Sequence, residues 1–255
     1  MKKNTMMRLA SILLVCVLLT TSVISGTFAK YVTAATANDS ARVAKWGITM
    51  SNGDDMFKAN YVDTVVAANG TDKIVAPGTD GSTTYEVDGT PEVDYKITFE
   101  GTKLDNEMYL GEGTYTYAGT NVEYVGMNAT LTQKYYPLDW RVTIKSTEGS
   151  VSGGWVANVP QVFTTLGEAM TALAGASVTY NANTPCDLVV LIQWEWDYDA
   201  SSGFIAEATC ASNNVHDTIL GDLVPTENAN LTASAGADFS LNVGYTVKMT
   251  ATQID

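Results

Sequence analysis

Residues 93–100 read VDYKITFE, a strict alternation of apolar and polar side chains. Successive side chains of an extended strand point to opposite faces, so Val93, Tyr95, Ile97 and Phe99 share one face and the polar residues share the other. This pattern predicts a strand with one buried and one solvated face, which is typical of an antiparallel sheet.

The same period recurs in four other segments, Arg42–Met50, Tyr135–Lys145, Cys186–Asp199 and Phe239–Thr250. The third begins as a continuous apolar run before it alternates, which favours a central strand. Turn signals separate the segments, among them the Pro-Gly and Asp-Gly pairs in Ala76–Ser82. The sequence therefore predicts an all-β fold, an antiparallel jelly-roll or β-sandwich.

One short helix is expected within this β protein. Thr165 and Glu168 have the spacing of a capping box, and Gly175 gives a helix end. Apolar residues follow at helical spacing at Leu166, Ala169, Met170 and Leu173.

The N-terminus has the three parts of a secretory signal helix. A basic tip is followed by an uncharged apolar run from Leu9 to Ile24 and then by small residues. Thr27 and Ala29 occupy the −3 and −1 positions of a cleavage before Lys30. The alternative is an uncleaved anchor, but the run is shorter than the about 20 residues of a spanning helix. We therefore expect a secreted protein with no membrane attachment after cleavage by a signal peptidase.

The charge balance excludes several classes of partner. With 28 acidic against 14 basic residues, the formal net charge is −14. Such a chain does not bind nucleic acid or anionic lipid by electrostatic attraction. Self-assembly is expected to be helped by salt or divalent cations, because both screen the repulsion between subunits.

The two cysteines beyond the predicted signal are Cys186 and Cys210. A hairpin centred near residue 198, at a turn-rich stretch, would place them opposite each other, and secretion permits a disulfide. The alternative is two free, buried thiols that pack as small apolar groups.

Catalytic chemistry is nearly absent from the sequence. His216 is the one histidine, so a His-Glu-x-x-His zinc protease helix cannot form. No Gly-x-Ser-x-Gly motif precedes this histidine, which we interpret as an exposed loop residue. The chain is therefore predicted not to be an enzyme.

Alternating carboxylates at Glu195, Asp197 and Asp199 form the one candidate cation site. On a strand they would share a face and could hold calcium weakly, although a plain solvated acidic face explains the pattern equally well. No other cofactor is expected. Trp194 and Trp196 fall on the opposite, inward face and are predicted to pack in the core.

Several segments together resemble the TasA/camelysin family of Gram-positive bacteria, in its clostridial branch. They are SGTFAKY and DSARVAKWGITMS near the N-terminus, IVAPGTDGSTTYEVDGTPEVDYKITF (Ile74–Phe99), YYPLDWRV, LIQWEWDYD and HDTILGDL. The resemblance implies a jelly-roll protein that is exported by a leader cut by a dedicated signal peptidase. It further implies a cell-surface or biofilm-matrix protein, whose fibre-forming relatives assemble by donor-strand complementation. Other relatives are described as surface metalloproteases, an activity for which this chain lacks the motif.

The expected division is a signal peptide over residues 1–29, an N-terminal extension with the first strand over 30–50, and a jelly-roll domain over 51–255. The extension is the candidate donor strand, because a flexible end can pair with the sheet edge of a neighbouring subunit and so propagate a filament. Its candidate side chains are Tyr31, Val32, Val43, Ala44, Trp46 and Ile48.

Two alternatives to full donation of this segment remain open. Arg42–Met50 can pair within its own subunit, or Lys30 to about Ser40 can be donated to a neighbour while Ala41–Met50 stays in its own subunit. The expected partners are other copies of the chain, a signal peptidase and an accessory matrix or anchor protein. The alternative functions are a non-polymerising surface adhesion or binding protein and, less favoured, a surface protease.

Overall fold

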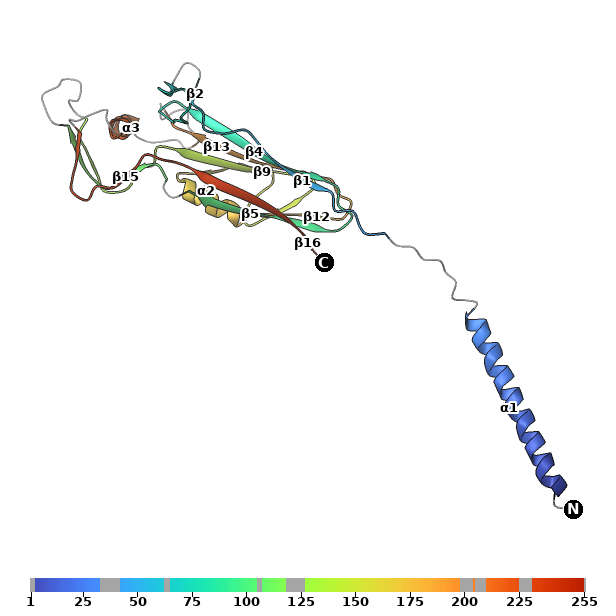
Figure 1. Cartoon of the computed structure of the whole chain (residues 1–255). Helices are drawn as coiled ribbons and strands as arrows, with labels where there is room; N and C mark the ends of the chain where they lie inside the picture. Colours follow the sequence, from blue (N-terminus) through green and yellow to red (C-terminus); the bar gives the residue numbers. More distant parts are fainter. Residues whose placement is uncertain are drawn as a thin grey trace. The chain divides into compact units, whose positions relative to one another are not determined.

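The computed structural model describes residues 3–32, 42–61, 65–104, 107–117, 127–197, 204, 210–224 and 231–254 (Figure 1). The chain divides into two compact units, Met1–Val43 and Ala44–Asp255. In the first unit, α1 spans Lys3–Val32. Within the described residues, no helix combines the length and hydropathy needed to cross a membrane. Thr27, Ala29 and Lys30 lie in the last turns of α1, and the cleavage stays a prediction.

The larger of two main sheets in the second unit has five strands and is antiparallel throughout. Its order is β1-β4-β13-β9-β11. The strands span Ile48–Asn52 (β1), Asp80–Gly89 (β4), Cys186–Glu195 (β13), Asp139–Lys145 (β9) and Gln161–Phe163 (β11). The predicted central strand is confirmed, since β13 lies between β4 and β9.

The second main sheet has four antiparallel strands in the order β10-β12-β5-β16. They span Ser150–Ser152 (β10), Ser177–Tyr180 (β12), Tyr95–Lys103 (β5) and Tyr245–Gln253 (β16). Figure 1 shows the strands of the two sheets running in two adjacent layers. The ring of Trp140 on β9 meets the ring of Tyr245 on β16 at a centroid distance of 6.4 Å, so the layers share one core.

Smaller antiparallel pairings complete the described structure. A three-stranded sheet has the order β14-β7-β8, and two further pairs are β15-β6 and β2-β3. These strands span Leu231–Ala233 (β14), Gly113–Tyr117 (β7), Ala129–Leu131 (β8), Phe239–Ser240 (β15), Tyr109–Leu110 (β6), Asn60–Tyr61 (β2) and Val65–Val66 (β3). The prediction of an all-β protein is confirmed.

The core consists of the apolar faces predicted by alternation. Tyr95, Ile97 and Phe99 on β5 are buried, as are Trp140, Val142 and Ile144 on β9. Along β13 every second residue is buried, from Cys186 to Trp194. Trp194 and Trp140 face each other directly in the β13–β9 register, which brings two large side chains together where β13 ends and β9 begins.

The predicted helix is confirmed as α2, Leu166–Ala174. The Thr165 side chain accepts a hydrogen bond from the Glu168 backbone N–H over 3.1 Å, as an N-cap does. Leu166, Ala169, Met170 and Leu173 form its buried stripe. The helix packs on β5 and also touches β9 and β11, so it contacts both main sheets.

A second helix, α3 (Cys210–Asp222), was not predicted. Val215 and Ile219 in this helix and Leu223 just after it recur every four positions, a helical spacing that the turn-rich sequence around them obscured. The helix has no acidic residue in its first turn and no basic residue in its last.

Two local predictions were wrong. The Asp80-Gly81 pair is not a turn but the start of β4. The strand needs glycine at this position, because a Cβ on residue 81 would stand only 2.2 Å from the Met56 carbonyl oxygen and 2.5 Å from Trp194 Nε1. The alternation from Phe239 to Thr250 is interrupted between β15 and β16. Residues 241–244 belong to no strand, and the Leu104 backbone N–H donates to the Gly244 carbonyl oxygen just before β16 begins.

Candidate functional site

The segment that leads into the domain is anchored to both main sheets. The Glu92 backbone N–H donates to the Lys45 carbonyl oxygen, and the Glu92 carboxylate accepts from the Lys45 backbone N–H, each over 2.9 Å. The Trp46 ring meets the edge of the Tyr95 ring on β5 at 6.3 Å. Two residues later, Ile48 pairs with Gly89 on β4. The segment therefore crosses from the four-stranded to the five-stranded sheet.

The predicted strand Arg42–Met50 is shorter than expected and begins only at Ile48. Its predicted inward face is also wrong, because Ala44, Trp46 and Met50 are exposed and only Ile48 is half-buried. The reason is position: β1 lies at the end of its sheet and is paired on one side only. Val43 is 91% exposed and Trp46 39%. Tyr31 and Val32 end α1, and their side chains lie outside the described residues, as do residues 33–41.

The two main sheets present strand edges close to each other. β1 ends the five-stranded sheet and β16 ends the four-stranded one, each with one partner strand among the residues described. A pocket of about 300 Å³ is lined by Asn52 of β1, Tyr85 of β4 and Tyr245 of β16. The Tyr85 and Tyr245 hydroxyls are 3.4 Å apart across the two layers. One side of the domain therefore carries two main-chain edges that can accept another strand.

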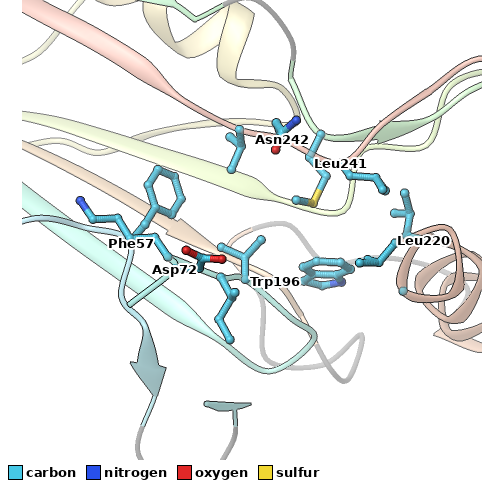
Figure 2. Close-up of a pocket in the computed structure, with 13 residues that line it drawn as sticks. Phe57, Asp72, Trp196, Leu220, Leu241 and Asn242 are labelled. Atoms are coloured by element: carbon cyan, nitrogen blue, oxygen red, sulfur yellow. The ribbon is translucent and has the colours of Figure 1, made fainter. Parts of the chain in front are cut away.

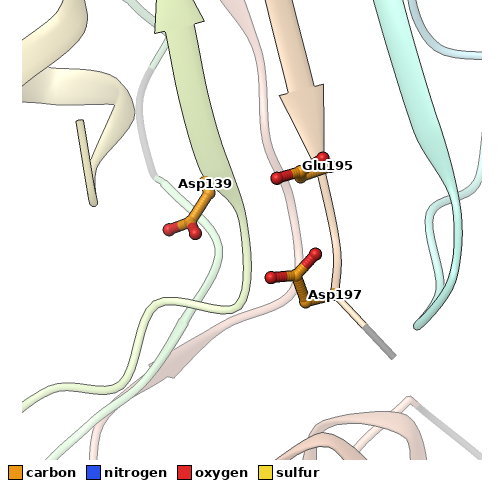
Figure 3. A group of neighbouring side chains, drawn as sticks. All are labelled: Asp139, Glu195 and Asp197. Carbon is orange, nitrogen blue, oxygen red and sulfur yellow. The ribbon is translucent and has the colours of Figure 1, made fainter. Parts of the chain in front are cut away.

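The predicted carboxylate cluster forms with one change of membership. Asp139, Glu195 and Asp197 each place an oxygen within 4.8 Å of the others (Figure 3). Asp139 replaces Asp199, which lies outside the described residues. Glu195 and Asp139 are directly opposite in the β13–β9 register, a relationship that single-strand alternation could not reveal. With one ligand oxygen from each carboxylate, the cluster supplies three of the 6–8 oxygens that calcium takes, so water or other groups would complete any coordination.

Glu195 is the electrostatically strained member of the cluster. Burial raises the pKa of its carboxyl, and nearby Asp197 and Asp80 raise that pKa further. The Phe204 backbone N–H, which donates to Glu195 Oε1, and the Arg141 guanidinium lower the pKa but do not offset the increase. Like charges placed directly across two strands destabilise a sheet, so a bound cation would reduce the repulsion between these carboxylates.

The predicted Cys186–Cys210 disulfide is absent. Cys186 is a free thiol, only 5% exposed at the start of β13. The expected hairpin does not form, because Cys210 begins α3 and β13 pairs with β4 and β9 instead. Burial raises the pKa of the Cys186 thiol, which keeps it protonated and unreactive.

His216 is not the exposed loop residue that the sequence suggested. It lies on α3, half-buried, with its ring 5.0 Å from the Tyr135 ring. Burial lowers its pKa, and within the described part of the chain its Nδ1 has no hydrogen-bond partner.

Trp194 and Trp196 are buried as predicted, at 0% and 5% exposed. Trp194 donates from its indole to the Met56 carbonyl oxygen, and its ring makes a tilted contact with Phe57 and an edge contact with Tyr61. Neither tryptophan presents an exposed face for a sugar ring, which favours the packing role over a carbohydrate platform.

Comparisons of the chain with protein-family models, with curated proteins and with solved structures found no match.

Proposed function

We propose that this protein is a secreted structural subunit of a cell-surface or biofilm-matrix filament, built on a jelly-roll domain. The observation that carries the proposal is the pair of neighbouring strand edges, β1 and β16, each with one partner strand among the described residues. An extended segment that adds to such an edge gains main-chain hydrogen bonds, and its alternate side chains set the register. The sequence resemblance to the TasA/camelysin family supports the same proposal.

The geometry favours partial donation over donation of the whole segment. Three contacts hold Ala44 to Asn52 within its own subunit. They are the Lys45–Glu92 backbone hydrogen bond, the Trp46–Tyr95 ring contact and the five-residue pairing of β1 with β4. The segment left for a neighbouring subunit is therefore Lys30 to about Val43, with Tyr31, Val32 and Val43 as candidate side chains. Head-to-tail addition of this kind does not close on itself, so it extends a filament.

Cleavage before Lys30 is the proposed trigger for assembly. A signal helix joined to Lys30 would keep the segment from entering a neighbour, whereas a free N-terminus can reach it. Salt is expected to promote the process, because the net charge of −14 makes subunits repel one another at low ionic strength.

The test is negative-stain electron microscopy of purified Lys30–Asp255 beside a truncation that begins at Ala44. The truncation keeps the whole second compact unit, including β1, so its fold is preserved and can be checked by circular dichroism. Filaments from the first protein and monomers from the second support the proposal. Monodisperse particles from both, with salt and calcium added, contradict it and favour a surface-binding protein.

A matched pair of variants tests the donated side chains directly. Tyr31→Asp places a charge at a candidate apolar position and is expected to abolish filaments. Asn38→Asp adds the same charge at a position that is already polar and should leave filaments intact. Equal loss in both variants would attribute the effect to charge alone and would contradict side-chain docking.

A further inference from the structure

An apolar cavity adjoins the pocket between the β1 and β16 edges. The cavity has a volume of about 750 Å³, and most of its thirteen lining residues are apolar (Figure 2). It shares Phe57 and Lys73 with the smaller pocket at the two edges, so the two form one continuous surface. Such a surface is suited to a peptide, because strand edges bind main chain and an apolar hollow takes side chains.

The lining of the cavity combines buried and partly exposed apolar side chains. Met108, Trp196 and Leu220 are buried. The half-buried apolar members are Phe57, Ile74, Val75, Leu241 and Val243. Apolar surface that is still partly exposed to water favours association with apolar side chains, because covering it is favourable.

The cavity and the point where the N-terminal segment leaves the domain lie at opposite ends of the sheets. Ile48, near the leaving point, pairs with Gly89 at the end of β4. Trp196, in the cavity lining, directly follows Glu195, which pairs with Asp80 at the start of β4. The ten residues of β4 therefore separate the two places by about 30 Å.

Figure 1 shows the same arrangement within the domain. The helix α3, which contributes Leu220 to the cavity, lies at one end, and the end of β16 lies at the other. A segment that leaves one subunit at one end and docks at the opposite end of the next subunit joins them head to tail. Such a contact propagates a filament, because it leaves one cavity and one segment unused at the two ends.

The segment Lys30–Val43 has an apolar tip and a small, polar remainder. Tyr31 and Val32 follow its first residue, whereas residues 33–41 read TAATANDSA. Cleavage before Lys30 leaves only three residues of α1, fewer than one helical turn, so the tip can become extended. Nine extended residues span about 30 Å, a length that bridges two subunits placed end to end.

The tip and the cavity carry opposite charges. After cleavage the tip has the Lys30 ammonium and a new α-amino group, and the one acidic residue of the segment is Asp39. In the cavity lining, Lys73 is paired with Asp55, with Nζ 2.7 Å from Oδ2. The exposed Asp72 carboxylate has no ion pair within the described part of the chain. The cavity therefore attracts a cationic peptide end.

We propose that this cavity is the docking site for the tip of a neighbouring subunit, residues Lys30 to Val32 of a second copy of the chain. The Tyr31 and Val32 side chains occupy the apolar hollow, the Lys30 ammonium lies near Asp72, and residues 33–41 connect the two subunits. The docking site rests on the proposed filament function and supplies its acceptor surface.

Disulfide trapping in the intact Lys30–Asp255 protein tests this contact. Thr33→Cys leaves the tip unchanged, and Asn242→Cys replaces an exposed polar residue of the cavity lining, both in a Cys186→Ala/Cys210→Ala background. After mild oxidation we expect a ladder of covalent oligomers on a non-reducing gel, which collapses to one band with reductant. The matched control pairs Thr33→Cys with Asn181→Cys, an exposed position beyond the end of β12 and outside the cavity lining, and should give no ladder.

The outcomes separate this docking site from the filament itself. Filaments by electron microscopy without a ladder, or with an equal ladder in the control, would overturn the docking site and leave the proposed function standing. A single cross-linked chain without oligomers would show that the tip docks on its own subunit, which overturns the docking between subunits. Absence of both filaments and ladder would contradict the proposed function and the docking site together.

A peptide assay measures the docking without filaments. A peptide of residues 30–43, labelled at its C-terminus, is titrated with Ala44–Asp255, the second compact unit, and followed by fluorescence anisotropy. Val224→Asp places a charge at a 47% exposed lining residue and should weaken binding at least about tenfold. Val156→Asp makes the same change at an exposed valine between β10 and β11, outside the lining, and should leave affinity within about twofold. Equal affinities of the two variants would overturn the docking site.

A charge exchange tests the position of Lys30. Lys30→Glu in the peptide and Asp72→Lys in the domain should each weaken binding severalfold, because each removes the attraction between the two side chains. The two changes combined should restore most of the affinity, which a merely structural role of Asp72 would not do. Losses that simply add in the combination would overturn the placement of the tip beside Asp72.

Discussion

The Tyr180 hydroxyl donates a hydrogen bond to Asp187 Oδ1 over 3.1 Å and so joins the two main sheets, because Tyr180 ends β12 and Asp187 lies on β13. Ser146 donates to the same oxygen over 2.7 Å, and the Thr147 backbone N–H donates to Oδ2. Tyr180 and Ser146 are both buried. One carboxylate therefore satisfies two buried hydroxyls at the junction of the layers.

The first prediction concerns the pH dependence of this junction. Burial would raise the pKa of Asp187, but the hydrogen bonds from Ser146, Thr147 and Tyr180 outweigh it and lower that pKa below its usual 3.8. The stabilisation is therefore complete above pH 3.8 and is lost as the pH falls through the lowered value. Asp187→Asn should lower the free energy of unfolding by about 1–2 kcal/mol at pH 7.

Urea denaturation of both proteins between pH 2 and pH 7 measures this difference. The gap between wild type and Asp187→Asn should be constant near neutrality and should shrink in acid. Glu86→Gln, an exposed change on neighbouring β4, is the control and should shift stability little. A gap that is constant down to pH 2 would show that the carboxylate charge is not responsible.

The second prediction concerns Glu195, whose charged carboxylate lowers the stability of the fold. Burial and the neighbouring carboxylates raise the pKa of Glu195, so the charged form opposes folding as the pH rises through that raised value. In EDTA, Glu195→Gln should raise the melting temperature at pH 7, and the gain should vanish below about pH 4.5, the ordinary pKa. Because Glu195 is partly solvated, the expected gain is below about 1 kcal/mol.

Calcium provides the second arm of this test. At about 1 mM it should raise the melting temperature of the wild type more than that of Glu195→Gln, because the cation offsets the repulsion within the Asp139–Glu195–Asp197 cluster. The exposed Glu112→Gln change serves as the control and should behave as wild type. Equal calcium shifts in all three proteins would place the ion elsewhere.

Much of the core could be predicted because alternation reports burial on one face of a strand. That information is local, and it was correct for β5, β9 and β13, each of which pairs with a strand on both sides. It failed for Arg42–Met50 because the same alternation occurs at a sheet edge, where no second strand covers the apolar residues. Periodicity does not distinguish a central strand from an edge strand.

Site geometry was less accessible, because it depends on contacts between distant strands. The cluster required Asp139 opposite Glu195, a register set by the whole of β9 and β13. Symmetric cysteine spacing suggested a hairpin, but β13 found its partners in β4 and β9, which lie earlier in the chain.

The third prediction tests the cap of α2. Thr165 accepts from Glu168 N–H, and the Glu107 carboxylate, itself buried, accepts from Leu166 N–H at the same helix end. Thr165→Ala removes the side-chain acceptor and should cost about 1 kcal/mol of unfolding free energy. Thr165→Ser keeps the hydroxyl and should restore most of that stability. Equal losses in the two variants by urea denaturation would mean that packing of the methyl group, not capping, matters.

The fourth prediction asks whether β1 stays in its own subunit within a filament. Ser51 on β1 and Glu86 on β4 are direct cross-strand partners. A Ser51→Cys/Glu86→Cys pair, in a Cys186→Ala/Cys210→Ala background, can therefore form a disulfide that fixes β1 to β4 of its own subunit. Because only Lys30 to about Val43 is proposed to be donated, the oxidised protein should still form filaments and run as a single chain on a non-reducing gel. A matched lock between β10 and β12, Ser152→Cys/Ser177→Cys, controls for oxidation and added sulfur. If the β1 lock alone keeps the protein monomeric until reductant is added, β1 itself is exchanged between subunits, and the donated segment must be extended to Asn52.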